Sequence, residues 1–179
     1  MTTYTMALER YDRHVPFFTG AITPPAGIEI EPLEVGIDHT HRDGRDRHER
    51  MLRNNEFDIC ELSFSSYIMA VDRGADLTAT PVFPRRLFSQ NHIYVRADSG
   101  IQTPADLAGR KVALRAFQTT MSVLVKGDLK FFYGVPWENI HWIMEAEEAL
   151  AWTAERAELG TDWHVLYLGE APSTYDTLL

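Results

Sequence analysis

Short apolar runs alternate with helix-forming stretches along the chain, and this alternation predicts an α/β fold. In the first half of the chain, the runs of strand length are residues 3–8, 28–35, 57–62, 77–83 and 92–96. The helical stretches between them are residues 15–19, 45–55 and 65–74. The first two strands and the turn between them form a predicted βαβ unit, and Met51 and Leu52 are expected to face inward from the next helix.

The second half of the chain repeats this alternation. Thr103 as a cap residue, Pro104 at the first helical position and Gly109 as a stop predict a one-turn helix. The strands predicted after it are residues 111–116, 140–144 and 163–168. Helices are predicted at residues 118–133 and, from composition alone, at 145–159, and a Ser173–Asp176 capping box predicts a helix start at Thr174.

Composition and charge narrow the class of protein. The 179 residues suffice for one domain or two small lobes, and 45% hydrophobic with 24% charged residues is typical of a globular protein. The net charge of −9 argues against nucleic-acid binding, which uses clustered basic surfaces. The segment from Trp137 to Leu179 contains nine acidic residues and one basic residue, Arg156. The rest of the chain is therefore nearly neutral, which is compatible with an anionic ligand.

The sequence also carries information about the location of the protein in the cell. Charges or prolines interrupt every apolar run before it reaches the length of a membrane span. The first residues lack the basic and then apolar segments of a secretory signal, so a cytoplasmic protein is expected; a periplasmic protein would need its leader already removed. The single Cys60 excludes an internal disulfide and is expected to be a small buried hydrophobic residue.

Three segments carry a family resemblance: YDR at 11–13, MLRNNEFDICELSFSSYIMA at 51–70, and FPRRLFSQNHIYVRADSGIQTPADLAGRKVAL at 83–114. They resemble the 4,5-dihydroxyphthalate decarboxylase family, and the resemblance is strongest over 51–121. It implies a cytoplasmic offshoot of the type 2 periplasmic binding proteins, with two α/β lobes that hold the ligand between them. The activity implied is decarboxylation of 4,5-dihydroxyphthalate, or a similar aromatic dicarboxylate, to protocatechuate and carbon dioxide.

The resemblance also implies a domain organisation. Residues 1–95 correspond to the first α/β lobe and residues 96–179 to part of the second. Family members continue beyond the position that matches Leu179, so the second lobe and the return into the first lobe are expected to be incomplete in this chain.

Decarboxylation of an aromatic ring requires cations that hold the carboxylates and an acid that protonates the ring carbon. Arg85 and Arg86 follow an apolar run, and Arg13 follows the first strand. A guanidinium binds a carboxylate through two parallel hydrogen bonds, which makes these three arginines candidate substrate-binding residues. The alternative is that they are solvated surface arginines.

Two strand-to-helix loops are rich in hydroxyl and amide groups, which bind anions together with the free N–H groups of a helix start. These candidate substrate-binding residues are Ser63, Ser65 and Ser66 in the first lobe and Gln118, Thr119 and Thr120 in the second. The alternative role for the serines is ordinary helix capping.

Two residues are candidates for the catalytic proton donor. His92 is expected to begin a strand between the lobes, and imidazole is a general acid near neutral pH. Glu61 is the second candidate, provided that burial raises its pKa. The alternatives are a structural histidine at position 92 and a solvent-facing or salt-bridged carboxylate at position 61. The spacing of His39, His41 and His48 matches no strong metal-ligand signature, and the sequence identifies no cofactor.

Two other functions remain open. A non-catalytic solute-binding protein shares the fold and its anion-binding strand ends, and a fragment or regulatory lobe would turn over nothing. Turnover distinguishes the enzyme from both, whereas a ligand-induced rise in melting temperature without turnover indicates a binder. In each case the expected partner is a small anionic aromatic molecule rather than nucleic acid or a membrane, and the sequence does not determine the oligomeric state.

Overall fold

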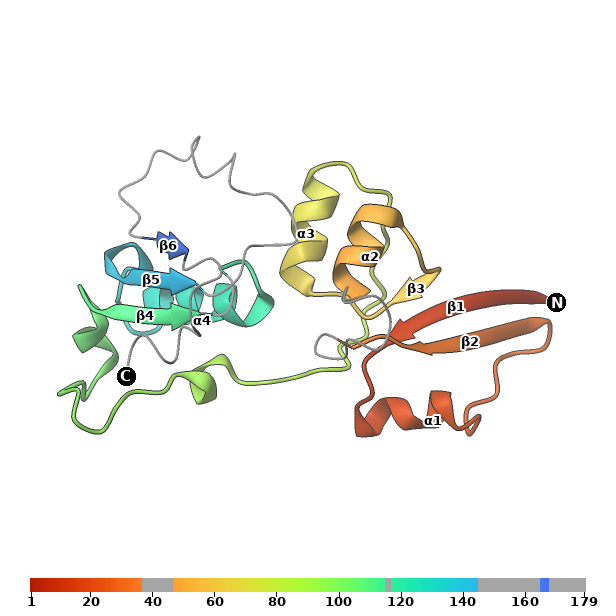
Figure 1. The fold of residues 1–179 in the computed structure, drawn as a ribbon, viewed down its shortest axis with the longest axis horizontal. Helices are drawn as coiled ribbons and strands as arrows, with labels where there is room; N and C mark the ends of the chain where they lie inside the picture. The colour runs from red at the N-terminus through yellow and green to blue at the C-terminus, as the bar shows by residue number, and fades with distance from the viewer. Residues whose placement is uncertain (37–46, 115–116, 145–164, 168–179) are drawn as a thin grey trace. The chain divides into compact units, whose positions relative to one another are not determined.

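Residues 1–36, 47–114, 117–144 and 165–167 are the part of the chain that the computed structural model describes (Figure 1). The chain divides into two units, a first unit of Met1–Arg85 and a second unit of Arg86–Leu179. Each unit is built on its own parallel sheet, which agrees with the predicted α/β class. The predicted lobe boundary after residue 95 stays a prediction.

The first unit contains a three-stranded parallel sheet in the order β2-β1-β3. Its elements are β1 (Thr2–Leu8), the 3-10 helix η1 (Asp12–His14), α1 (Val15–Phe18), β2 (Ile28–Glu34), α2 (Arg47–Asn54), β3 (Ile59–Cys60) and α3 (Phe64–Asp72). The register of β1 with β2 runs from Thr2 opposite Ile28 to Leu8 opposite Glu34. The predicted βαβ unit is therefore confirmed, and β3 is shorter than the predicted strand because only Ile59 and Cys60 pair with β1.

A small apolar core lies between this sheet and α2. Its buried members are Ala7, Val35, Met51 and Phe57. Met51 faces inward as predicted, because the stripe of α2 that carries it packs against the sheet, while Leu52 is half-buried. Cys60 is also half-buried and packs against the core, so it is less buried than the sequence suggested.

Asp58 links the middle of β1 to the start of β3. The backbone N–H and the hydroxyl of Thr5 both donate to Asp58 Oδ2, at 2.8 and 2.9 Å, and the Asp58 N–H donates to Thr5 Oγ1 at 3.1 Å. The hydrogen bond from the Thr5 backbone is the main reason why the pKa of Asp58 lies below its ordinary value of 3.8. Hydrogen bonds to the charged form favour that form.

We expect this contact to make the first unit acid-sensitive. A carboxyl with a depressed pKa stabilises the folded state above pH 3.8 and loses that contribution as the pH falls below it. Between about pH 5 and about pH 3, the melting temperature of Asp58→Asn should therefore fall less than that of the unmodified chain. Thermal unfolding followed by circular dichroism tests this, with the exposed Asp76→Asn as control. Identical acid profiles for all three proteins would contradict the role of Asp58.

The second unit contains a parallel sheet in the order β4-β5-β6. Its elements are the 3-10 helices η2 (Ser89–His92), η3 (Pro104–Leu107) and η4 (Trp137–Asn139), the strands β4 (Lys111–Leu114), β5 (His141–Met144) and β6 (Val165–Tyr167), and the helix α4 (Thr120–Phe131). The predicted one-turn helix is confirmed as η3, where Thr103 and Asp106 form a reciprocal capping box. Gly134, which directly follows the helix predicted at 118–133, has a φ of +67°, which favours glycine.

Two predicted strands are wrong. Residues 77–83 and 93–96 pair with no strand in the described part of the chain, and His92 ends the 3-10 helix η2 instead of beginning a strand. Apolar and β-branched residues give a segment strand propensity, but a strand forms only where a neighbouring backbone completes its ladder of hydrogen bonds.

Several predictions lie outside the described residues. They concern His39 and His41, the helix at 145–159, and the capping box at Ser173–Asp176. In the part of the chain that is described, no helix is long and apolar enough to cross a membrane.

Candidate anion-binding site

The carboxyl ends of the three strands of the first unit meet at one edge of the sheet. The register places Leu8 opposite Glu34, and Ala7 opposite Cys60, so β1, β2 and β3 end side by side. The loops that follow β1 and β3 carry most of the first unit's predicted site residues. Open α/β sheets bind ligands at this kind of edge.

A buried arginine joins the three segments that leave this edge. The Arg47 guanidinium is 2% exposed, and its Nη1 donates to Glu9 Oε2 at 2.8 Å and to the Val35 carbonyl at 3.2 Å. Its Nη2 donates to Glu61 Oε2 at 2.9 Å, and its Nε donates to the Glu61 carbonyl at 2.9 Å. Arg47 thus holds together the chain after β1, β2 and β3, with two carboxylates around one guanidinium.

This network determines the surroundings of Glu61. Its carboxylate forms an ion pair with Arg47 and accepts a hydrogen bond from the Glu9 N–H at 3.4 Å. The salt-bridged alternative from the sequence analysis is thus the arrangement found, and a role of Glu61 as proton donor stays a prediction.

Two predicted arginines lie against one aromatic ring beyond the end of β1. The Cζ atoms of Arg13 and Arg85 lie 5.4 and 5.8 Å from the ring centroid of Tyr11. Both arginines are exposed, and neither forms an ion pair with any residue in the described ranges. We call Tyr11, Arg13 and Arg85 the tyrosine–arginine cluster. It presents two cationic groups to solvent, which is suited to a ligand with two negative charges.

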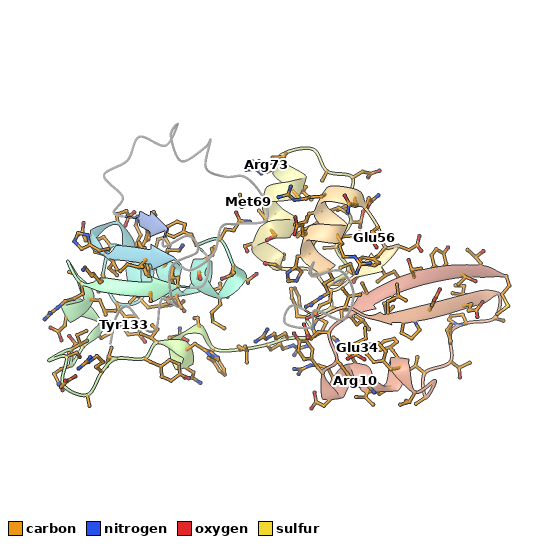
Figure 2. All side chains as sticks on the ribbon, in the orientation of Figure 1. Arg10, Glu34, Glu56, Met69, Arg73 and Tyr133 are labelled. Carbon is orange, nitrogen blue, oxygen red and sulfur yellow. The ribbon has the colours of Figure 1, made fainter. Side chains whose placement is uncertain are left out.

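The neighbouring Arg10 is engaged elsewhere. Its Nη1 forms an ion pair of 2.6 Å with Glu34 at the end of β2, and Figure 2 shows these two side chains directed toward each other. Its Cζ also lies 5.5 Å from the centroid of the Phe18 ring. Arg10 is therefore held by an acidic partner, in contrast to Arg13 on the same loop.

The serines of the first unit surround the start of α3. Ser63 occupies the N-cap position without a capping hydrogen bond from its side chain, and its Oγ lies 3.2 Å from Ser65 Oγ. Ser65 and Ser66 are buried in the first turn. The structure thus places these three hydroxyls on the loop and helix start after β3, and their role in binding stays a prediction.

In the second unit, the predicted polar residues lie at the start of α4. Thr119 is the N-cap: its Oγ1 accepts a hydrogen bond from the Ser122 N–H at 3.4 Å and donates to Ser122 Oγ at 2.8 Å. Gln118 is buried, and Thr120 is the first residue of the helix. Thr119 therefore has a structural role in capping, whatever else this loop binds.

A second buried cation lies behind this loop. Lys126 of α4 is 6% exposed, and its Nζ donates to the Phe117 carbonyl at 2.6 Å. The same Nζ lies 3.0, 5.7 and 6.0 Å from the ring centroids of Phe117, Trp142 and Trp137. The cation–π contact and this hydrogen bond fix the position of Phe117, the residue directly before Gln118.

The remaining sequence-predicted residues, Arg86 and His92, belong to the second unit. His92 is exposed at the end of η2, and Arg86 is an exposed residue at the start of the second unit. Beside His92, Gln90 donates to Asp128 Oδ2 at 2.7 Å, and Ser89 donates to the same oxygen. In the described ranges no group of three histidine, cysteine, aspartate or glutamate side chains is placed to hold a metal ion.

Sequence reasoning missed both buried cations. The available signal was helical spacing: Arg47 and Met51 are four residues apart on the buried stripe of α2, and Lys126 falls between Ser122 and Leu129 on the buried stripe of α4. A charged residue in an apolar stripe indicates a buried ion pair or an aromatic contact.

Comparison with known proteins gives both a family and relatives. The family model described as "ABC transporter, phosphonate, periplasmic substrate-binding protein" matches residues 31–138. A 4,5-dihydroxyphthalate decarboxylase of Comamonas testosteroni is 36% identical over 144 residues, which are 78% of this chain and 40% of the relative. A 4,5-dihydroxyphthalate decarboxylase of Pseudomonas putida is 35% identical over 125 residues, 65% of this chain and 48% of the relative.

The relatives confirm the resemblance inferred from the motifs in the sequence. The chain spans less than half the length of both proteins.

Proposed function

The chain belongs to the family of ABC transporter phosphonate periplasmic substrate-binding proteins, and from this premise we propose that it binds an aromatic dicarboxylate and supports its decarboxylation. The type 2 periplasmic-binding-protein-like fold of this family agrees with the two parallel α/β units and with the predicted fold class. The proposed reaction is loss of one carboxylate from 4,5-dihydroxyphthalate or a similar aromatic dicarboxylate, because both relatives are named 4,5-dihydroxyphthalate decarboxylase.

The tyrosine–arginine cluster is the observation that carries this proposal. Two exposed guanidiniums, those of Arg13 and Arg85, share one tyrosine ring, while the carboxylates of Glu34 and Glu9 at the strand ends are bonded to Arg10 and Arg47. A phthalate carries two adjacent carboxylates, and two guanidiniums beside one tyrosine ring complement them in charge and can bind each through parallel hydrogen bonds.

In the reaction, the bond between the ring carbon and one carboxylate carbon breaks. The electron pair stays on the ring carbon, carbon dioxide departs, and a proton replaces it at that carbon. We assign binding of the two adjacent carboxylates of the substrate to Arg13 and Arg85. Ser63, Ser65 and Ser66, Arg86 and Gln118 to Thr120 are the further proposed binding groups, and His92 or Glu61 is the proposed proton donor.

Chromatographic detection of protocatechuate after incubation of the purified chain with 4,5-dihydroxyphthalate tests the proposal. Arg85→Ala should lower affinity for the dicarboxylate about 10- to 100-fold, since a hydrogen-bonded charge pair contributes about 1.5–3 kcal/mol. Its affinity for an uncharged catechol should hardly change. The control is Arg10→Ala, which removes another arginine of the first unit that is already bonded to Glu34. Equal losses for dicarboxylate and catechol would contradict the role of Arg85.

A solute-binding protein without catalysis is the second candidate function, supported by the description of the matched family. It predicts that 4,5-dihydroxyphthalate raises the melting temperature while no protocatechuate forms. A cytoplasmic location is expected for the decarboxylase and stays a prediction, which cell fractionation tests.

A further inference from the structure

Tyr11 is held in place by the loop that follows β1. Its N–H donates to the Glu9 carbonyl at 3.0 Å, and its own carbonyl accepts from the N–H groups of His14 and Val15 at 2.9 and 3.1 Å. The His14 ring lies 5.1 Å from the Tyr11 ring, is buried, and bonds through Nδ1 to the Glu9 carbonyl at 2.7 Å. The Tyr11 ring therefore has a defined position at the end of β1.

Glu9 connects the loop that carries Tyr11 to the buried side chain of Arg47. The Glu9 carboxylate accepts a hydrogen bond from Arg47, and the Glu9 carbonyl oxygen is bonded to the Tyr11 N–H and to the His14 ring. A chain of contacts thus runs from the Arg47 network at the strand ends to an aromatic ring at the surface. Rigid supports of this kind position binding groups accurately.

The Tyr11 ring in turn is contacted by both Arg13 and Arg85. Each guanidinium carbon lies within 6 Å of its centroid, so the two cations are no farther apart than the sum of 5.4 and 5.8 Å. Like charges at this separation repel each other, and the negative face of an aromatic ring offsets part of that repulsion. The arrangement favours a ligand that supplies two negative charges close together.

We infer that Tyr11 is a positioning residue, which holds the guanidiniums of Arg13 and Arg85 as one pair selective for adjacent carboxylates. This inference rests on the proposed function and deepens it, because it identifies the residue that distinguishes a dicarboxylate from a monocarboxylate. The inferred role requires the aromatic ring of Tyr11 and does not require its phenol hydroxyl.

Calorimetric titration with phthalate and with benzoate tests the inference, on the unmodified chain, Tyr11→Phe and Tyr11→Leu. Tyr11→Phe keeps the ring and should bind phthalate like the unmodified chain. Tyr11→Leu should weaken phthalate binding about 5- to 30-fold and benzoate binding less than threefold, because two cation–π contacts are lost. A role in folding alone would lower both affinities by the same factor, and that result would overturn the inference.

A second measurement needs no ligand. In the nuclear magnetic resonance spectrum, the side-chain Hδ signals of Arg13 and Arg85 should be shifted upfield by the Tyr11 ring. The shifts should persist in Tyr11→Phe and vanish in Tyr11→Leu. If the unmodified chain binds no phthalate, the proposed function fails, and these shifts still decide whether Tyr11 holds the two arginines. Unshifted Arg13 and Arg85 signals in the unmodified chain would overturn the inference whatever the titrations show.

Discussion

Arg47→Met is expected to lower the free energy of unfolding of the first unit by about 3–5 kcal/mol, the usual effect of removing one partner from a buried ion pair. The substitution leaves the carboxylates of Glu9 and Glu61 at the strand ends without the guanidinium that bonds to both. It also removes the donors to the Val35 and Glu61 carbonyls. The expected loss is a large part of the stability of a small domain.

The distribution of tryptophan allows the two units to be followed separately. All four tryptophans lie in residues 86–179, so tryptophan fluorescence reports on the second unit, whereas hydrogen exchange of β1 and β3 amides reports on the first. In urea, Arg47→Met should shift the exchange-detected unfolding of the first unit to a lower concentration. Unchanged protection of β1 would contradict the prediction.

Two further variants make this experiment specific. Arg53→Met removes an exposed ion pair with Glu49 on the same helix and should change stability by less than about 1 kcal/mol. Adding Glu61→Gln to Arg47→Met should recover part of the loss, because one of the two uncompensated charges is then gone. Equal destabilisation by Arg47→Met and Arg53→Met would show that the buried network contributes no more to stability than the exposed ion pair does.

Trp142→Ala is expected to lower the free energy of unfolding of the second unit by about 3–5 kcal/mol, the range for removing a large aromatic residue from a core. Trp142 is 1% exposed, its ring meets the Phe117 ring edge to face at 6.4 Å, and its Nε1 donates to the Trp137 carbonyl at 2.8 Å. The substitution also removes one of the aromatic rings that surround Lys126 Nζ.

Urea unfolding followed by circular dichroism measures this effect, since the variant alters the fluorescence itself. Trp142→Phe should recover more than half of the loss, because it restores most of the ring volume but not the indole N–H. Phe131→Ala is the control, since this side chain is 81% exposed on the same unit. A midpoint for Trp142→Ala equal to that of Phe131→Ala would contradict the assignment of Trp142 to the core.

Part of the candidate site could be predicted residue by residue. Arg13 is predicted as a binding residue because polar side chains after a strand lie at the ligand-binding edge of a sheet, and the structure does place it after β1. Arg85 is predicted because it follows residues 77–83, which form no strand in the structure, yet it lies against the same tyrosine as Arg13. The pairing of residues 13 and 85 depends on contacts between distant parts of the chain, about which local patterns carry no information.

The sequence by itself determined the order of strands and helices, because alternation of apolar and polar residues, proline and glycine positions and cap residues act over a few neighbouring residues. It also determined the family, through motifs that are local as well. Only the tertiary structure decided that Arg47 and Lys126 are buried and that residues 77–83 and 92–96 are not strands. The physical reason is that ion pairs, aromatic contacts and strand ladders each need a partner, and the partner is supplied by another part of the folded chain.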